Sequence, residues 1–208
     1  MHNLLKPFII FAASMALISC GTSGSDPDYK NPELPVQDRV EDLLERMTVE
    51  EKLGQLLCPL GWPMYVKTET PEGATAGISD EYRKFIDEQH GGMLWATFRA
   101  DPWTRKTLEN GLDPRLAAEA YNALQRYAID STRLGIPMIL AEEAPHGHMA
   151  IGTTVFPTSI GLASTWDKAL ITEVGRTIAR ELRAQGGHIG YGPVIDLARE
   201  PRWSRVEE

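Results

Sequence analysis

Three apolar segments alternate with two amphipathic helical segments between residues 92 and 197. The apolar segments cover residues 92–96, 137–141 and 188–197. The two helical segments carry apolar residues on one face at four-residue steps, namely Leu116, Ala120, Leu124 and Ala128 in the first and Leu170, Val174, Ile178 and Leu182 in the second. Strands that are apolar on both faces and joined by helices are typical of parallel βαβ units. The pattern therefore predicts an α/β fold with about three parallel strands.

Parallel strands with helical crossovers leave two main architectures, an open doubly wound sheet and a (β/α)8 barrel. No Gly-x-Gly-x-x-Gly motif follows any of the apolar segments, which argues against a dinucleotide-binding sheet. The barrel is therefore favoured. Three strands cannot close a barrel by themselves, so the sequence predicts the N-terminal portion of a TIM (β/α)8 barrel.

Local signals place the remaining helices and loops. A helix is expected over residues 36–57, restarted by a capping box in which Thr48 is the N-cap and Glu51 reaches back. Asp113 and Asp167 are expected N-caps of the two amphipathic helices. Residues 61–79 and 98–113 are expected to be irregular loops. Trp62 and Tyr65, in the first loop, could stack on a sugar ring, but anchoring in the core is favoured.

The N-terminal residues indicate export rather than folded structure. A charge-free apolar run from residue 8 to 18 follows Lys6, and it is shorter than the roughly 20 residues that span a bilayer. The run ends at Cys20 after small residues, which resembles the lipobox of a bacterial lipoprotein. We expect a signal peptide over 1–20 with lipidation of Cys20, a flexible tether over 21–35, and the folded domain over 36–208. This predicts a cell-envelope location, as an outer-membrane lipoprotein or a periplasmic protein.

Charge and cysteine content restrict the partners. The formal net charge is −8, and it becomes more negative by one when Lys6 leaves with the leader. An acidic surface argues against nucleic acid and anionic lipid as ligands, whereas a neutral sugar is compatible with it. The lipid anchor would then be the only membrane contact. Cys58 has no partner if Cys20 is lipidated, so no disulfide is expected and Cys58 should pack as a small apolar residue.

Two carboxylates follow the second apolar segment, where a parallel barrel places its catalytic face. Alternation along a strand sends Glu142 and Glu143 to opposite sides, so only one should point into the mouth, where it could accept two sugar hydroxyls. The alternative is a solvated acidic loop. His146 and His148 lack the spacing and the further ligands of a metal site, so no metal is expected, and His146 should brace the loop by hydrogen bonds.

A second cluster, Arg199 to Arg205, follows the third apolar segment and places three arginines around Trp203. Such a cluster could grip a phosphate. The neighbouring acidic residues Glu200, Glu207 and Glu208 instead favour an ion-pair scaffold from which one arginine reaches the substrate. A purely structural role is the remaining alternative.

Taken in order, eight motifs resemble those of glycoside hydrolase family 3, the β-glucosidase and β-xylosidase family, and the resemblance runs from about Val36 to the last residue. The motifs are MTVEEKLGQL (47–56), GIP (135–137), EAPHG (143–147), TVFP (154–157), GLASTWD (161–167), EVGR (173–176), PVID (193–196) and REPRWSRVE (199–207). The resemblance implies a TIM barrel followed by an α/β sandwich, and a retaining hydrolase that releases the sugar at the non-reducing end of a β-glycoside. It implies no metal or organic cofactor.

The resemblance also assigns residues. It implies that Glu143 holds hydroxyls of the terminal sugar and that Arg205 binds the same sugar. Glu200 and Ser204 replace the Asp and Gly usual in the arginine-rich motif, which affects the shape of that loop. The nucleophile and the acid/base of this family lie beyond residue 208, so no catalytic residue is expected here and the chain alone should be inactive. The alternatives are a non-catalytic surface sugar-binding lipoprotein and a non-functional gene fragment.

Overall fold

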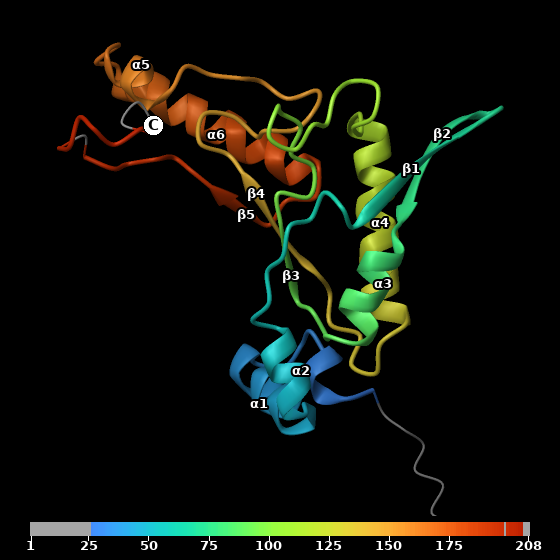
Figure 1. Cartoon of the computed structure of the whole chain (residues 1–208). Helices are drawn as coiled ribbons and strands as arrows, with labels where there is room; N and C mark the ends of the chain where they lie inside the picture. Colours follow the sequence, from blue (N-terminus) through green and yellow to red (C-terminus); the bar gives the residue numbers. More distant parts are fainter. Residues whose placement is uncertain (1–25, 198, 206–208) are drawn as a thin grey trace, which may run out of the picture. The chain divides into compact units, whose positions relative to one another are not determined.

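The structure is a computed structural model that describes residues 26–197 and 199–205 (Figure 1). The described residues fall into two compact units, divided between Arg46 and Met47. The expected signal peptide over 1–20, the lipidation site Cys20 and the first residues of the expected tether lie outside the described residues. No helix in the described part is long and apolar enough to cross a membrane.

The first unit contains a short 3-10 helix, η1 (Asp28–Lys30), and α1 (Val36–Arg46). The backbone N–H of Tyr29 donates to the Asp42 carboxylate at 3.0 Å, and the Arg39 side chain donates to the Tyr29 carbonyl at 3.1 Å. Within the expected tether, residues 28–30 are therefore hydrogen-bonded to α1 rather than free. The domain boundaries themselves stay a prediction.

The second unit holds two sheets and five helices among its described residues. Its elements are α2 (Val49–Gly54), β1 (Tyr65–Thr70), β2 (Gly73–Ile78), α3 (Asp80–Asp87), β3 (Met93–Trp95), α4 (Pro114–Asp130), β4 (Ile139–Glu143), α5 (Ser159–Ala163), α6 (Lys168–Ala184) and β5 (Ile189–Tyr191). Strands β3, β4 and β5 form a parallel sheet in that order, which confirms the α/β class and the three parallel strands. This sheet is open in the described residues, and its closure into a barrel stays a prediction.

The register of the sheet determines which residues stand at its carboxyl edge. Trp95 is paired with Ala141, and Glu143 is paired with Tyr191. Trp95, Glu143 and Tyr191 are the last residues of their strands, so their side chains begin at one common edge of the sheet.

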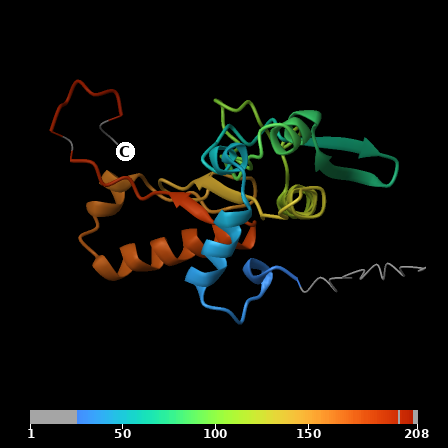
Figure 2. The same ribbon diagram turned by 90° about the horizontal axis from the view of Figure 1, so that it is seen from below.

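The core of the second unit lies where α3 and α4 pack on β3 and β4. Tyr82, Leu94, Leu124 and Leu140 are completely buried there, and the Tyr82 hydroxyl donates to the Leu124 carbonyl at 2.8 Å. Helix α6 lies beside β5 in both views (Figures 1 and 2), where Leu182 packs against Gly190. Helices α3 and α4 therefore cover β3 and β4, and α6 packs beside β5.

The helix signals predicted from the sequence are confirmed. Thr48 and Glu51 form the reciprocal capping box at the start of α2, although the helix ends at Gly54 rather than continuing to residue 57. The Asp113 side chain caps α4 through the Leu116 N–H, and the Asp167 side chain caps α6. Residues 80–87, which carried no prediction, form α3 with Ser79 as the N-cap.

The expectation of an irregular segment over 61–79 is wrong. Residues 65–78 form an antiparallel hairpin whose two-residue loop lies between Thr70 and Gly73, and Gly73 has the positive φ of 122° that this connection uses. The hairpin is fastened to α4, because Arg115 donates to the Ala74 carbonyl at 2.8 Å and the Ala76 N–H donates to Glu119 at 3.2 Å. Tyr65 is buried in the core, and the partly buried Trp62 packs against that core. This confirms the prediction that both aromatic residues anchor the loop in the core.

The strand boundaries also differ from those predicted. Strand β4 begins two residues later than expected, because the Gln125 side chain takes both backbone groups of Met138, at 2.7 and 3.0 Å. Strand β5 ends at Tyr191 rather than at residue 197, since Gly192 packs tightly against Ala144 and Pro193 has no N–H to donate. Cys58, expected to be buried, is exposed.

Candidate functional site

A cavity of about 750 Å³ lies at the carboxyl ends of β3, β4 and β5. Residues from the ends of all three strands and from the loops that follow them contribute to it. The lining residues that bear on function are Trp95, Arg99, Trp103, Glu143, Tyr191 and Arg205. Parallel α/β folds commonly bind their ligands at this edge, which makes the cavity the candidate site.

Glu143 and Glu142, neighbours in sequence, have opposite environments, as alternation along β4 predicts. Glu143 lines the cavity, and its Oε1 accepts a hydrogen bond from Trp95 Nε1 at 2.8 Å. Glu142 is 0 % exposed and faces the interior. The prediction that only one of the pair points into the mouth is therefore confirmed, and Glu143 is that residue.

The buried Glu142 carboxylate holds the loop that follows β3. Its two oxygens accept the backbone N–H groups of Thr97 and Phe98 at 3.1 and 3.2 Å. Burial raises the pKa of Glu142 to about 8, while those two backbone donors act in the opposite direction. The buried Thr97 side chain lies beside the same carboxyl group and also acts to lower its pKa.

Arg99 is fixed on the wall of the cavity by three neighbours. Its Nε donates to Asp101 Oδ2 at 2.7 Å, and its Nη2 lies 2.6 Å from the same oxygen. Its guanidinium lies 4.6 Å from the centre of the Trp103 ring, within the range of a cation–π interaction. Its Nη1 lies 3.8 Å from Glu143 Oε1. In the sequence, Arg99 is marked only by its place within the irregular loop expected over residues 98–113.

Further aromatic rings lie next to Trp103, the ring that contacts Arg99. The Trp103 ring lies 4.8 Å from Trp62, edge to face, and 5.7 Å from Trp95. Trp95 is in turn 6.4 Å from Tyr191 at the end of β5. Trp103 remains 53 % exposed, so part of its ring faces the solvent. Such a wall offers apolar surface next to charged groups, the combination that a sugar ring requires, since its C–H face is apolar and its rim carries hydroxyls.

Arg205, the second substrate-binding residue predicted from the sequence, lines the same cavity as Glu143. The structure therefore brings together the two side chains that the sequence analysis selected. Glu200 and Arg202 form an ion pair with contacts of 2.7 Å, in line with the predicted scaffold. Glu207 and Glu208, also assigned to that scaffold, lie outside the described residues.

The two histidines of the following loop have structural surroundings. His146 Nδ1 lies 2.9 Å from the Phe156 carbonyl, and the Phe156 N–H donates to the His146 carbonyl at 2.8 Å, which confirms the predicted bracing. His148 is buried, and burial lowers its pKa. In the described part of the chain, no group of three or more His, Cys, Asp or Glu side chains is placed to hold a metal ion.

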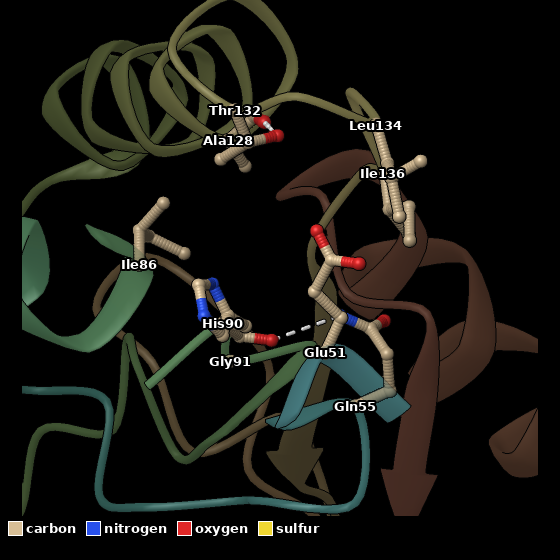
Figure 3. Close-up of a pocket in the computed structure, with 9 residues that line it drawn as sticks. All are labelled: Glu51, Gln55, Ile86, His90, Gly91, Ala128, Thr132, Leu134 and Ile136. Carbon is tan, nitrogen blue, oxygen red and sulfur yellow. Dashed lines mark hydrogen bonds between the residues drawn. The ribbon is translucent and has the colours of Figure 1, made fainter. Parts of the chain in front are cut away.

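The opposite edge of the sheet contains a much smaller hollow of about 40 Å³ (Figure 3). His90 and Gly91 precede β3 and Ile136 precedes β4, so this hollow lies at the amino ends of the strands. Gln55 reaches across it and donates to the His90 carbonyl at 3.0 Å, while Glu51 pairs with Arg133 at 2.6 Å. Closed contacts at this end of a parallel sheet indicate stability rather than ligand binding.

Comparisons with known proteins identify the family of the chain. Residues 48–208 match the profile of the family described as "Glycosyl hydrolase family 3 N terminal domain". The chain is 42 % identical over 136 residues to a β-xylosidase of Formosa agariphila, a match that covers 56 % of this chain and 19 % of that protein. It is 30 % identical over 189 residues to a periplasmic β-glucosidase/β-xylosidase of Dickeya chrysanthemi, covering 86 % of this chain and 26 % of that protein.

A solved structure shares the fold. A novel β-glucosidase from Erythrobacter marinus superimposes with a TM-score of 0.63 at 25 % identity, covering 86 % of this chain and 21 % of that one. The chain spans about a quarter of the length of the curated relatives that it matches over most of its own length.

Proposed function

The chain belongs to the family of glycosyl hydrolase family 3 N-terminal domains, and from that premise we propose that it forms the sugar-holding part of a retaining β-glycosidase. The enzyme would act from the non-reducing end and cleave the O-glycosidic bond of a terminal β-linked sugar, with β-glucosides as the favoured substrates. Relatives named as β-glucosidases and as β-xylosidases support both a glucose-like and a xylose-like ring.

One observation carries this proposal: Glu143 and Arg205 line one cavity at the carboxyl edge of the parallel strands. A carboxylate accepts hydrogen bonds from hydroxyl groups, and a guanidinium donates to their oxygens. The two groups together complement a neutral polyol. The fold also supports a partial (β/α)8 barrel, since its strands, crossovers and site edge are those of the first part of such a barrel.

Retaining hydrolysis requires a nucleophilic carboxylate and an acid/base about 5–5.5 Å apart across the scissile bond. We assign neither role to residues 1–208. The whole protein would supply both from outside this range and enclose the sugar against the wall formed by Glu143 and Arg205. No cofactor is part of this chemistry.

The test uses the full-length protein that carries residues 1–208, with aryl β-glucoside, aryl β-xyloside and aryl α-glucoside as substrates. Hydrolysis of a β-glycoside is expected, with no cleavage of the α-anomer. Glu143→Gln should lower kcat/KM by about 100-fold, since a charge-assisted hydrogen bond to the sugar is lost. Glu72→Gln, at the exposed hairpin loop, is the matched control and should leave kcat/KM unchanged. Failure of the wild-type protein to hydrolyse any β-glycoside would refute the proposed activity.

A non-catalytic sugar-binding protein is the second candidate, because the lining of the cavity complements a sugar and holds neither of the two catalytic groups. Calorimetric titration of the full-length protein with glucose and xylose separates the two. Saturable binding without any turnover would favour the binding protein, whereas turnover would exclude it.

We also propose that the protein is attached to the cell envelope through a lipid on Cys20, as an outer-membrane lipoprotein or on the periplasmic side. The apolar run that ends at Cys20 and the periplasmic relatives support this location. Metabolic labelling with a palmitate analogue should label the wild-type protein and not the Cys20→Ser variant. Equal labelling of both would exclude the anchor at this residue.

A further inference from the structure

The hydrogen bonds of Glu143 leave part of its carboxylate available to a ligand. Oε1 accepts from Trp95 Nε1 at 2.8 Å, and Oε2 accepts no hydrogen bond from the described residues. Each carboxylate oxygen has two acceptor positions. Trp95 thus fixes the orientation of the carboxylate, and Oε2 and a second position on Oε1 remain without a donor among the described residues of a side chain that lines the cavity.

Arg99 presents a donor group beside these open positions. Asp101 engages its Nε and Nη2, whereas Nη1 makes no hydrogen bond to the described residues and lies 3.8 Å from Glu143 Oε1. That distance is too long for a direct hydrogen bond, which ends near 3.2 Å. An oxygen atom placed about 2.8 Å from both groups fits between them.

The backbone that carries Arg99 is held independently of any ligand. The two residues before Arg99 are Thr97 and Phe98, and their backbone N–H groups donate to the buried Glu142 side chain at 3.1 and 3.2 Å. Trp103 lies against the guanidinium on its other side. An arginine that is already fixed loses little side-chain entropy on binding, which favours a recognition role over a solvated one.

From this geometry we propose that Arg99 is a further substrate-binding residue, and that Arg99 and Glu143 hold one and the same hydroxyl of the terminal sugar. The hydroxyl donates its proton to the Glu143 carboxylate and accepts from Arg99 Nη1. Only a group that is donor and acceptor at once satisfies both partners, so the pair selects a sugar hydroxyl and rejects its deoxy analogue. This inference rests on the proposed function, because it concerns the same cavity.

The test measures kcat/KM of the full-length protein for an aryl β-glycoside and its four monodeoxy analogues. Wild type, Arg99→Gln, Arg99→Lys and Glu143→Gln are compared, with Arg105→Gln as the matched control on an exposed arginine of the same loop. At one ring position, removal of the hydroxyl should lower wild-type kcat/KM at least 10-fold. Arg99→Gln should lower it about 10- to 100-fold on the parent sugar and less than threefold on that one analogue. Glu143→Gln should also lower kcat/KM on the parent sugar and have little effect on the analogue that lacks the hydroxyl at that same ring position.

Each outcome decides between the roles. If Arg99→Gln lowers kcat/KM equally on all five substrates, Arg99 is structural and the inference is overturned. If Arg99 and Glu143 couple to different ring positions, the shared hydroxyl is overturned. Arg99→Lys, which keeps the charge and loses the planar fork, provides the same comparison should the Gln variant fail to fold. An active wild type with no coupling refutes only this inference, whereas a wild type inactive on every β-glycoside refutes the proposed function with it.

Discussion

Replacing the buried Glu142 by Gln should make the stability of the protein less dependent on pH. The carboxyl is 0 % exposed, and burial raises its pKa from 4.5 to about 8. Between these two values the folded state binds a proton that the unfolded state has lost, so stability falls as the pH rises through this window. Each pH unit removes at most about 1.4 kcal/mol. Near pH 8 the folded state also ionises, so the loss from pH 6 to pH 8 is about 2 kcal/mol.

The variant changes the hydrogen bonds as well. Thr97 and Phe98 donate to different oxygens of Glu142. At pH 6 the carbonyl and hydroxyl oxygens of the protonated acid can each accept one of these N–H groups, whereas Gln accepts only one and its amide nitrogen faces the other. The unpaired donor costs about 1–3 kcal/mol. At pH 6 the wild type should therefore be the more stable protein. Because an amide does not titrate, this advantage should shrink by about 2 kcal/mol at pH 8.

The assay is thermal unfolding of both full-length proteins, followed by tryptophan fluorescence at half-unit steps from pH 5 to pH 9. At about 2–4 °C per kcal/mol for an unfolding unit of 150–250 residues, the Tm of the wild type should fall by roughly 4–8 °C more than that of Glu142→Gln between pH 6 and pH 8. Other titrating groups are common to both proteins and cancel in the difference. Two Tm curves that run parallel over this range would show that Glu142 does not titrate in the way its burial implies.

Two further substitutions test the site and the core. Trp95→Phe removes the donor to Glu143 Oε1 while keeping an aromatic ring. Because one charge-assisted hydrogen bond is lost, KM for the β-glycoside should rise about 5- to 20-fold in steady-state assays. An unchanged KM would show that Trp95 does not orient Glu143. Gly91→Ala would place a Cβ only 1.9 Å from the Phe85 ring, so the free energy of unfolding measured with denaturant should fall by about 1–3 kcal/mol. The control Gly77→Ala has open space around it and should unfold at nearly the wild-type midpoint.

The sequence was sufficient for the helices with strong caps and for bringing Glu143 and Arg205 to one cavity. Asp113 and Asp167 cap α4 and α6 because each supplies a carboxylate to free N–H groups of the next turn, a local interaction that needs no knowledge of the fold. Glu143 and Arg205 could be placed at one cavity because the carboxyl ends of parallel strands share an edge.

What the sequence could not provide depends on contacts between distant residues. The hairpin of residues 65–78 carries Lys67 and Glu69 among its strand residues and is stabilised by Arg115 and Glu119 of α4, forty residues away in sequence. The start of β4 is delayed by the Gln125 side chain, which binds the backbone of Met138. The role of Arg99 depends on Glu142, Asp101 and Trp103 converging around one loop, and its position in an apparently irregular segment gave no signal for it.

The pairing of β4 with its neighbours determines which of two adjacent acids meets the solvent. Ala141 stands between Trp95 and Ile189, and Glu143 stands beside Tyr191. A slip of a single residue would exchange the inner and outer glutamates, placing the hydrogen-bonded anchor in the mouth and the hydroxyl acceptor in the interior. Insertions and deletions between Gly135 and Ile139 should therefore be far more damaging than point substitutions there. Attempts to alter ligand preference should change side chains around Glu142 and Glu143 and leave the length of this segment intact.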